Sequence, residues 1–268
     1  MRGDAGLPRE AGPTLREPFL KIRTITLDFW GTLLFDNASS DDRYKHCRMD
    51  DFDTILSGAG VPVSRRALAA AYETSASYLG RIWRDCRDVP VEDHVSAILA
   101  AADSGIAPLI GPALMAALVD AYARPALLMP PAVDDGARAA LETLAGRGYT
   151  FVLVSNTMRT PGTTLRKLLE RYGLLSFFAH TTFSDEVGVR KPAPEIFALS
   201  LRAVGGDAAT ALHVGDDAVL DVEGARAAGM RVIQVRSAPG RPPTSQAADA
   251  VIPGLDALPA AVERLDVG

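Results

Sequence analysis

Apolar residues recur along the chain in short runs, and polar or acidic residues follow most of them. The first run spans residues 22–30 and leads into an aspartate and a Gly-Thr turn. Similar runs occupy residues 150–154, 179–183, 211–214 and 231–235, with a shorter one at 250–252. Short apolar runs bounded by turn residues are typical of buried strands. The pattern therefore predicts six strands.

Segments with helical periodicity separate the later strands. They lie at residues 135–147, 163–172, 194–204 and 221–228, and a final one lies at about 256–265. Alternating strands and helices favour βαβ units, which build a parallel sheet with helices on both faces. We therefore expect an α/β fold with a Rossmann-like, doubly wound parallel sheet.

A long interval separates the first strand from the second. Residues 37–130 show helical periodicity at 44–59, 65–84, 91–103 and 114–122, and the tract at 123–131 resembles a hinge or linker. Such an interval is too long for a simple crossover. We predict a helical cap domain at 37–130, inserted into a core domain formed by 21–36 and 131–268. The Gly, Pro and charged residues of 1–20 predict a flexible N-terminal extension.

Composition narrows the range of partners. The 268 residues are 48% hydrophobic, enough for a buried core, and 28 basic against 33 acidic residues give a net charge of -5. This balance argues against binding to nucleic acid or to an anionic membrane. Cys47 and Cys86 lack the spacing of a metal site, and we find no signal peptide or membrane-length apolar segment. We expect a cytoplasmic protein, and the sequence leaves a homodimer open.

The predicted strand ends carry reactive side chains. In an open parallel sheet the ligand binds beyond the carboxyl ends of the strands, which here carry Asp28, Ser155 and Asp216-Asp217, with Lys191 in a nearby loop. A carboxylate nucleophile, a hydroxyl and an ammonium that hold charged oxygens, and carboxylates that hold a divalent cation can together transfer a phosphoryl group. Mg²⁺ prefers such oxygen ligands.

Four local patterns, in order, resemble the motifs of the haloacid dehalogenase (HAD) superfamily over about residues 20–255. Thr26 to Leu33 resembles motif I, and Val154-Ser155-Asn156 resembles motif II. Lys191 to Phe197 is similar to motif III, and Val214 to Ala225 closely follows motif IV. The chain is therefore identified as similar to HAD-like hydrolases that carry a helical C1-type cap.

This resemblance implies a role for each catalytic residue. Asp28 would be the nucleophile, the Ser155 hydroxyl would bind a phosphoryl oxygen, and Lys191 would stabilise charge on the nucleophile and the substrate. Asp221 would orient Lys191 in support of that role.

The resemblance also implies a Mg²⁺ site and a substrate site. The family pattern places the metal on Asp28, the backbone carbonyl of Trp30 and Asp216, with Asp217 as a further candidate behind them. The residues that we expect on the substrate side are Trp30, Thr32 and Asn156.

Trp30 departs from the family pattern. Most resembling phosphatases carry a second aspartate at this position, which protonates the leaving group and then activates water. An indole cannot do this, and general acid-base assistance is worth roughly 10²- to 10⁴-fold. Either another group moves the proton or the leaving group does not need one. Cap residues that could supply it are Tyr44, His46, Asp50, Asp51, Asp53 and His94.

Residues 28 and 30 should face the same side of an extended segment, so we expect the indole to line the site and narrow it.

We expect a Mg²⁺-dependent phosphohydrolase that acts on a small anionic, phosphorylated metabolite through an aspartyl-phosphate on Asp28. One alternative is a haloacid dehalogenase-like C–X hydrolase, since those enzymes also carry an aromatic residue at this position, although they lack the acidic metal pair. A second alternative is a weakly active or non-catalytic binding protein.

A third alternative is a resemblance to phosphonoacetaldehyde hydrolase, which needs a cap lysine. Lys45 is the only lysine within residues 37–130, and its spacing from Asp28 does not match that family. The basic group of Arg43, Lys45, His46 and Arg48 could instead bind an anionic part of the substrate.

Overall fold

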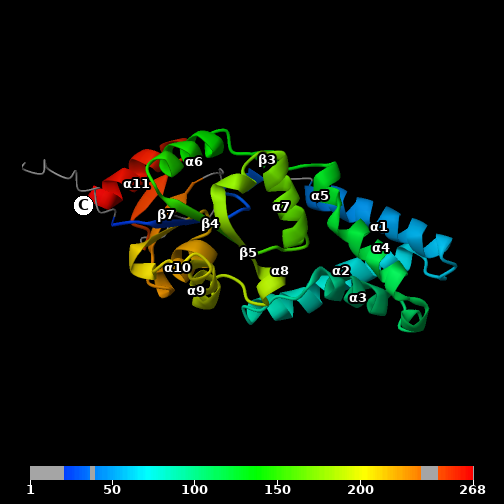
Figure 1. Cartoon of the computed structure of the whole chain (residues 1–268). Helices are drawn as coiled ribbons and strands as arrows, with labels where there is room; N and C mark the ends of the chain where they lie inside the picture. The colour runs from blue at the N-terminus through cyan, green and yellow to red at the C-terminus, as the bar shows by residue number, and fades with distance from the viewer. Residues whose placement is uncertain (1–20, 37–39, 237–246, 268) are drawn as a thin grey trace, which may run out of the picture.

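The computed structural model describes residues 21–36, 40–236 and 247–267, so the predicted extension at 1–20 lies outside the described residues. The described chain is elongated, with the sheet at one end and four long helices at the other (Figure 1). Within these ranges, no helix has both the length and the apolar character that a membrane span requires.

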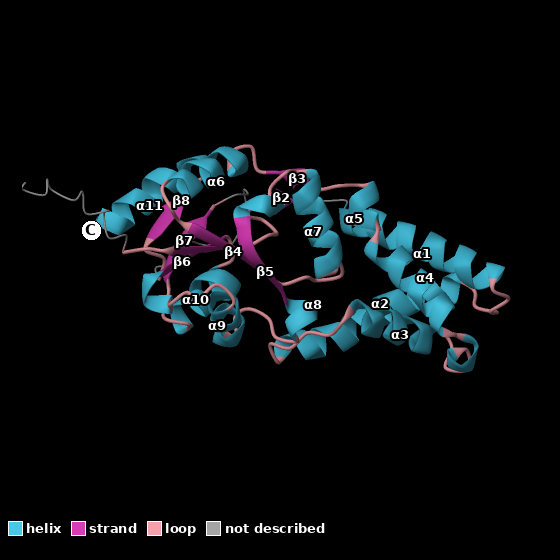
Figure 2. Cartoon of the chain, viewed as in Figure 1, coloured by secondary structure: helices cyan, strands magenta, loops and turns pink. Residues whose placement is uncertain are grey.

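A six-stranded parallel sheet forms the core, as predicted (Figure 2). Its strand order is β5-β4-β1-β6-β7-β8. The strands are β1 (Thr24–Leu27), β4 (Thr150–Ser155), β5 (Phe178–Phe183), β6 (Ala211–Gly215), β7 (Arg231–Val235) and β8 (Ala250–Ile252). In the register, Leu27 at the end of β1 pairs with Leu153 of β4 and Val214 of β6. The residues that follow these three strands therefore emerge at one edge of the sheet.

Alternating side chains bury both faces of the sheet. On β4, Phe151 and Leu153 belong to one apolar cluster, and Val152 and Val154 belong to another. The first cluster is covered by α6 (Ala137–Gly146), α7 (Gly162–Arg171) and α11 (Leu258–Val267). The second is covered by α9 (Pro194–Arg202) and α10 (Gly224–Ala227), while the short α8 (Ser184–Val187) follows β5. Helices on both faces make the sheet doubly wound, since each strand must bury two apolar sides.

Four helices form the cap and pack around an apolar cluster of their own. They are α1 (Ser40–Gly58), α2 (Arg65–Arg84), α3 (Val91–Ala102) and α4 (Pro112–Ala123). The cluster includes Phe52, Leu68, Ile98 and Leu118, one from each helix. These helices lie where the periodicity predicts them, and the exact limits of the core and cap domains stay predictions.

The structure adds elements that the hydrophobic pattern did not reveal. The predicted linker at 123–131 contains the short helix α5 (Pro125–Leu128), and β2 (Leu34–Phe35) pairs antiparallel with β3 (Ala132–Val133). Two-residue strands and single helical turns carry too few residues for a periodic signal. This small ribbon places the two chain crossings between core and cap side by side.

A polar contact also joins the cap to the core, and we call it the Asp88 junction. The buried Asp88 follows α2, and its Oδ2 accepts hydrogen bonds from Ser184 Oγ (2.5 Å) and Arg190 Nη1 (3.3 Å) of the core. Its Oδ1 accepts one from Trp83 Nε1 of α2 (3.0 Å). The carboxylate is therefore saturated by partners from both parts of the molecule.

Candidate active site

Asp28 leaves the central strand at the middle of the sheet edge. Its backbone N–H donates to the Val214 carbonyl (2.9 Å), which extends the ladder between β1 and β6, and its side chain is buried. Lys191 Nζ donates to Asp28 Oδ1 (2.5 Å) and to Asp221 Oδ1 (2.6 Å). The ammonium is thus held between the predicted nucleophile and the residue predicted to orient it.

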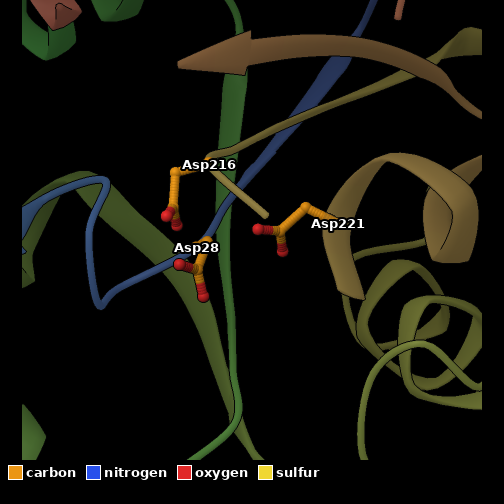
Figure 3. Close-up of side chains that lie close together, drawn as sticks. All are labelled: Asp28, Asp216 and Asp221. Carbon is orange, nitrogen blue, oxygen red and sulfur yellow. The ribbon is translucent and has the colours of Figure 1, made fainter. Parts of the chain in front are cut away.

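Three carboxylates meet at this position (Figure 3). Oxygens of Asp28, Asp216 and Asp221 lie within 4.8 Å of one another. The two oxygens of Asp221 are already used: Oδ1 contacts Lys191 and His213, and Oδ2 accepts from the backbone N–H of Asp217 (2.9 Å). Asp28 and Asp216 are therefore the pair best placed to hold a cation.

Thr32 lies between the members of that pair. Its fully buried hydroxyl is 3.5 Å from Asp28 Oδ2 and 3.4 Å from Asp216 Oδ1. The backbone turn that delivers it includes Gly31, whose φ of +79° lies in the left-handed region that favours glycine. This geometry links Thr32 to the carboxylates, and its predicted contact with substrate stays a prediction.

The charge of the group fits a divalent cation. Burial, reinforced by the charge of Asp221 and opposed by Lys191, raises the pKa of Asp28 to about 7. Burial alone would lower the pKa of Lys191, but Asp221 and Asp28 raise it, so the ammonium stays charged. Three buried carboxylates around one ammonium repel one another. Mg²⁺ on Asp28 and Asp216 would relieve that repulsion with the oxygen ligands it prefers.

His213 and Thr26 support Asp221 from beneath. His213 Nε2 lies 3.1 Å from Asp221 Oδ1, and its Nδ1 lies 2.7 Å from Thr26 Oγ1. Burial lowers the pKa of His213, although the hydrogen bond with Asp221 opposes this. Burial would raise the pKa of Asp221, but Lys191 and His213 lower it, so its carboxylate stays ionised. Sequence reasoning missed both residues, and their only signal is a polar side chain within an apolar strand.

Motif II positions its neighbours through the backbone. Asn156 Nδ2 donates to the Lys191 carbonyl (3.0 Å), and the Lys191 N–H donates to Asn156 Oδ1 (2.9 Å). Both ends of the carboxamide therefore hold the segment that carries Lys191, and the predicted contact of Asn156 with substrate stays a prediction. Ser155 is fully buried at the end of β4, and its Oγ donates to the Asn156 carbonyl (3.2 Å).

Asp217 caps the N-terminus of a helical turn. Its Oδ1 accepts from the N–H groups of Val219 and Leu220 (2.8 Å each), at the start of the π-helical turn Ala218–Glu223. The structure does not bring it into the carboxylate group of Figure 3, so its metal role stays a prediction. Asp217 is thus the N-cap residue of this turn. Its hydrogen bonds explain why helical structure begins at Ala218, before the predicted residue 221.

Trp30 lines a cavity of about 660 Å³ between the core and the cap. Its ring contacts Phe29 edge-on, with centroids 4.9 Å apart, and its buried Nε1 has no hydrogen-bond partner among the described residues. Core residues such as Arg159 and cap residues such as Tyr44 and Arg48 line the same space. The indole therefore forms a wall of this cavity, and the expectation that it narrows the substrate site beside Asp28 stays a prediction.

Tyr44 is the one predicted proton donor that lines this cavity; the other five are absent from its lining. Its hydroxyl lies 3.0 Å from Asp36 Oδ1 and 2.9 Å from the Met129 carbonyl, and burial raises its pKa. Asp36, which sequence reasoning missed, also lines the cavity, and burial raises the pKa of its carboxyl.

The four residues of the predicted basic group on α1 have different surroundings. Arg43 and His46 are exposed, and Lys45 forms an ion pair with Glu73. Arg48 instead is buried and lines the cavity. An ion-paired lysine gives no support to the phosphonoacetaldehyde hydrolase alternative, which needs a reactive cap lysine.

The chain is similar to known phosphatases over part of its length. It is 38% identical over 98 residues to the glyceraldehyde 3-phosphate phosphatase of Pyrococcus abyssi, covering 37% of this chain and 40% of that protein. It is 37% identical over 131 residues to the plasmid phosphoglycolate phosphatase of Cupriavidus necator, covering 48% and 54%. The chain thus spans about half or less of the length of these curated relatives.

Solved structures share the whole fold. A 2-haloacid dehalogenase from Pseudomonas syringae pv. tomato superposes with a TM-score of 0.67 at 22% identity, covering 91% of this chain and 99% of that one. A HAD phosphatase from Thermococcus onnurineus gives a TM-score of 0.57 at 21% identity, covering 90% and 98%. Because both kinds of protein share the fold, the fold alone does not choose the reaction.

A model of the haloacid dehalogenase-like hydrolase family matches residues 22–229. This span holds the nucleophile position, the lysine and the carboxylates described above. The chain belongs to the haloacid dehalogenase-like hydrolase family.

Proposed function

We propose that the protein is a Mg²⁺-dependent phosphohydrolase that acts on a small phosphorylated metabolite through an aspartyl-phosphate on Asp28. The observation that carries this proposal is the buried carboxylate pair of Asp28 and Asp216, with the Thr32 hydroxyl between them. A cation site has no use in displacement of a halide by a carboxylate. The phosphatase names of the partial relatives add support.

The residues divide the reaction between them. A carboxylate oxygen of Asp28 attacks phosphorus, the bond to the leaving oxygen breaks, and water then hydrolyses the aspartyl-phosphate to release phosphate. Lys191 and the Ser155 hydroxyl stabilise the charge on the phosphoryl oxygens. Mg²⁺ held by Asp28 and Asp216 would neutralise charge on the phosphoryl group. Asp221, fixed by His213, keeps Lys191 directed at Asp28.

Trp30 restricts the leaving group. Because an indole does not exchange protons near neutral pH, the alcohol of an ordinary ester would need its proton from another group. Asp36 is the candidate in the cavity, since burial favours its protonated form. An acyl phosphate, whose carboxylate leaving group needs no proton, is the substrate type for which this site needs no acid, and only the activation of water in the second step then falls to another group.

C–X hydrolysis is the second candidate, and Trp30 is the observation that favours it. Its buried N–H has no partner among the residues that the structure describes, so it could donate to a departing halide. That reaction would be independent of Mg²⁺, whereas the proposed phosphohydrolase requires it.

The deciding experiment measures phosphate release from a panel of acyl phosphates and phosphate esters, with and without Mg²⁺. The wild type is compared with Asp28→Asn and with Asp53→Asn, a cap aspartate absent from the cavity lining. Mg²⁺-dependent release that only Asp28→Asn abolishes would support the proposal. Metal-independent halide release from 2-haloacids would overturn it in favour of dehalogenation. Neither activity, together with thermal stabilisation by a metabolite, would indicate a binding protein.

A further inference from the structure

Two arginines from different parts of the fold share two buried tyrosines at the wall of the cavity. Arg48 of α1 donates from Nη1 to Tyr72 Oη (2.9 Å), and its guanidinium lies 4.4 Å from the ring centre of Tyr122. Arg159, in the loop after β4, donates from Nη1 to Tyr122 Oη (3.1 Å) and lies 4.1 Å from the ring centre of Tyr72. The two cations are thus fixed side by side.

Their remaining hydrogen bonds also go to neutral groups. Arg48 donates from Nε to the Tyr122 carbonyl (2.8 Å) and from Nη2 to the Arg159 carbonyl (3.0 Å). Arg159 donates to Ser75 Oγ (3.1 Å) and to the Tyr72 carbonyl (3.4 Å). Each guanidinium has five N–H groups, so each keeps two without a partner among the described residues. Neither forms an ion pair with a described carboxylate, although Arg48 is only 2% exposed.

The nearby acids have partners of their own. Glu73 is paired with Lys45, and Asp36 accepts from Tyr44. Arg190, the third cation of this region, is neutralised by Asp88. The charge of Arg48 and Arg159 also reaches His94, whose pKa is lowered to about 3 by burial and then by these arginines. A buried and a half-buried positive charge that form no ion pair are costly, and a bound anion would compensate them.

We propose that Arg48 and Arg159 bind a second oxyanion of the substrate, a carboxylate or a second phosphoryl group, at the opposite end from the phosphoryl group that Asp28 attacks. The inference rests on the proposed function and narrows it to small metabolites that carry two anionic ends. Trp30, two residues after Asp28, and both arginines line one cavity, so a molecule bound to the arginines would extend toward the position of Asp28. Planar guanidinium groups suit oxyanions because they donate parallel N–H bonds.

The contact would also serve catalysis. Binding energy from a remote anion fixes the position of the reacting phosphorus against the nucleophile. Because Arg48 comes from the cap and Arg159 from the core, the site is complete only when the two parts are packed together.

Binding and turnover are tested separately. In the Asp28→Asn variant with Mg²⁺, calorimetric titration compares 3-phosphoglycerate with glycerol 3-phosphate, and fructose 1,6-bisphosphate with fructose 6-phosphate. In each pair the first compound has the second anion and the other has a neutral group. We expect the member with the second anionic group to bind about 10- to 100-fold more tightly in at least one pair, the range for hydrogen bonds to charged groups. A preference in the first pair alone indicates a carboxylate site, and in the second alone a phosphoryl site.

The same titrations in Asp28→Asn/Arg48→Gln and Asp28→Asn/Arg159→Gln should lose this preference, and Arg48→Lys should keep part of it. Arg43→Gln, on the exposed part of the same helix, is the control and should keep it all. The preference is a ratio within one variant, so a general loss of structure does not imitate it. Equal binding within both pairs, or a preference that survives in both arginine variants, would overturn the inference. Absence of phosphate release from wild type with the preference intact would overturn the proposed reaction alone.

Discussion

His213 Nε2 lies 3.1 Å from Asp221 Oδ1, and this contact fixes the carboxylate that holds Lys191 against Asp28. Because burial keeps His213 neutral, its Nε2–H donates to Asp221 while Nδ1 accepts from the Thr26 hydroxyl. A strand that carries no attacking group thus determines where the ammonium sits.

Replacement of His213 should therefore slow the reaction. We expect His213→Gln to lower kcat about 10- to 100-fold, the effect of one hydrogen bond to a charged group, with a smaller change in KM. His180→Gln, at an exposed position of β5, is the matched control and should keep wild-type kcat. An unchanged kcat in a folded His213→Gln variant would show that Asp221 does not depend on this support.

Asp216 and Asp217 should differ in their response to magnesium. Asp216→Asn removes a charge from the proposed cation pair, so the Mg²⁺ concentration for half-maximal activity should rise about tenfold or more. Asp217→Ala should instead lower the melting temperature, because it removes an N-cap that contributes about 1 kcal/mol to stability. Magnesium titrations and thermal unfolding of both variants test this. A larger magnesium effect in Asp217→Ala would restore the predicted metal role of that residue.

Trp30→Asp should recover activity on simple phosphate esters. An aspartate at this position would supply the missing acid, and we expect kcat on an alkyl phosphate such as glycerol 3-phosphate to rise at least about tenfold. Trp30→Asn opens the same space without an acid and serves as the control. Equal gains in both variants would mean that the indole limits access, not proton transfer.

Asp36 should matter most for poor leaving groups. If its carboxyl supplies the proton, Asp36→Asn should lower kcat on alkyl phosphates about 10²-fold or more and change acetyl phosphate turnover little. Asp53→Asn, on the cap but absent from the cavity lining, is the control. A similar loss on both substrate types would assign Asp36 a structural role through its contact with Tyr44.

His94 should make the stability of the fold depend on pH. Its pKa is about 3 in the folded protein and near 6.5 once unfolded, because burial and then Arg159 and Arg48 oppose its charge. Below pH 6.5 the unfolded chain binds a proton that the folded chain does not. The free energy of unfolding should therefore decrease as the pH is lowered from 6.5 toward 3, by up to about 1.4 kcal/mol per pH unit.

This component should disappear in His94→Gln and persist in His46→Gln, where the replaced histidine is exposed. Urea unfolding between pH 4 and 7 measures it. Parallel curves for wild type and His94→Gln would contradict the assignment.

The sheet, its flanking helices and the carboxylates at its edge could be predicted because they leave repeated or ordered signals in the sequence. Each strand shows a run of apolar residues, and the family motifs follow in order. The sequence did not predict short elements such as β2 and β3. Their pairing depends on how the two segments that connect the core and the cap pack together.

The side chains around the carboxylate group and the cavity were harder to predict, because their positions depend on contacts between residues far apart in the sequence. Arg48 and Arg159 meet across 111 positions of sequence, and no local pattern connects them. His213 is a single polar residue in an apolar run. Asp216 and Asp217 are adjacent, yet one lies in the carboxylate group and the other caps a helix, a difference that only backbone direction decides.

The Asp88 junction bears on how product leaves. Its contacts between Asp88, Ser184 and Arg190 are polar, so separation of the cap from the core at this point exposes groups that water can solvate. An apolar seam would resist the same movement in proportion to its area. We therefore expect this side of the interface to separate more readily than an apolar seam of equal area, which would suit an enzyme whose cavity must exchange its contents with solvent.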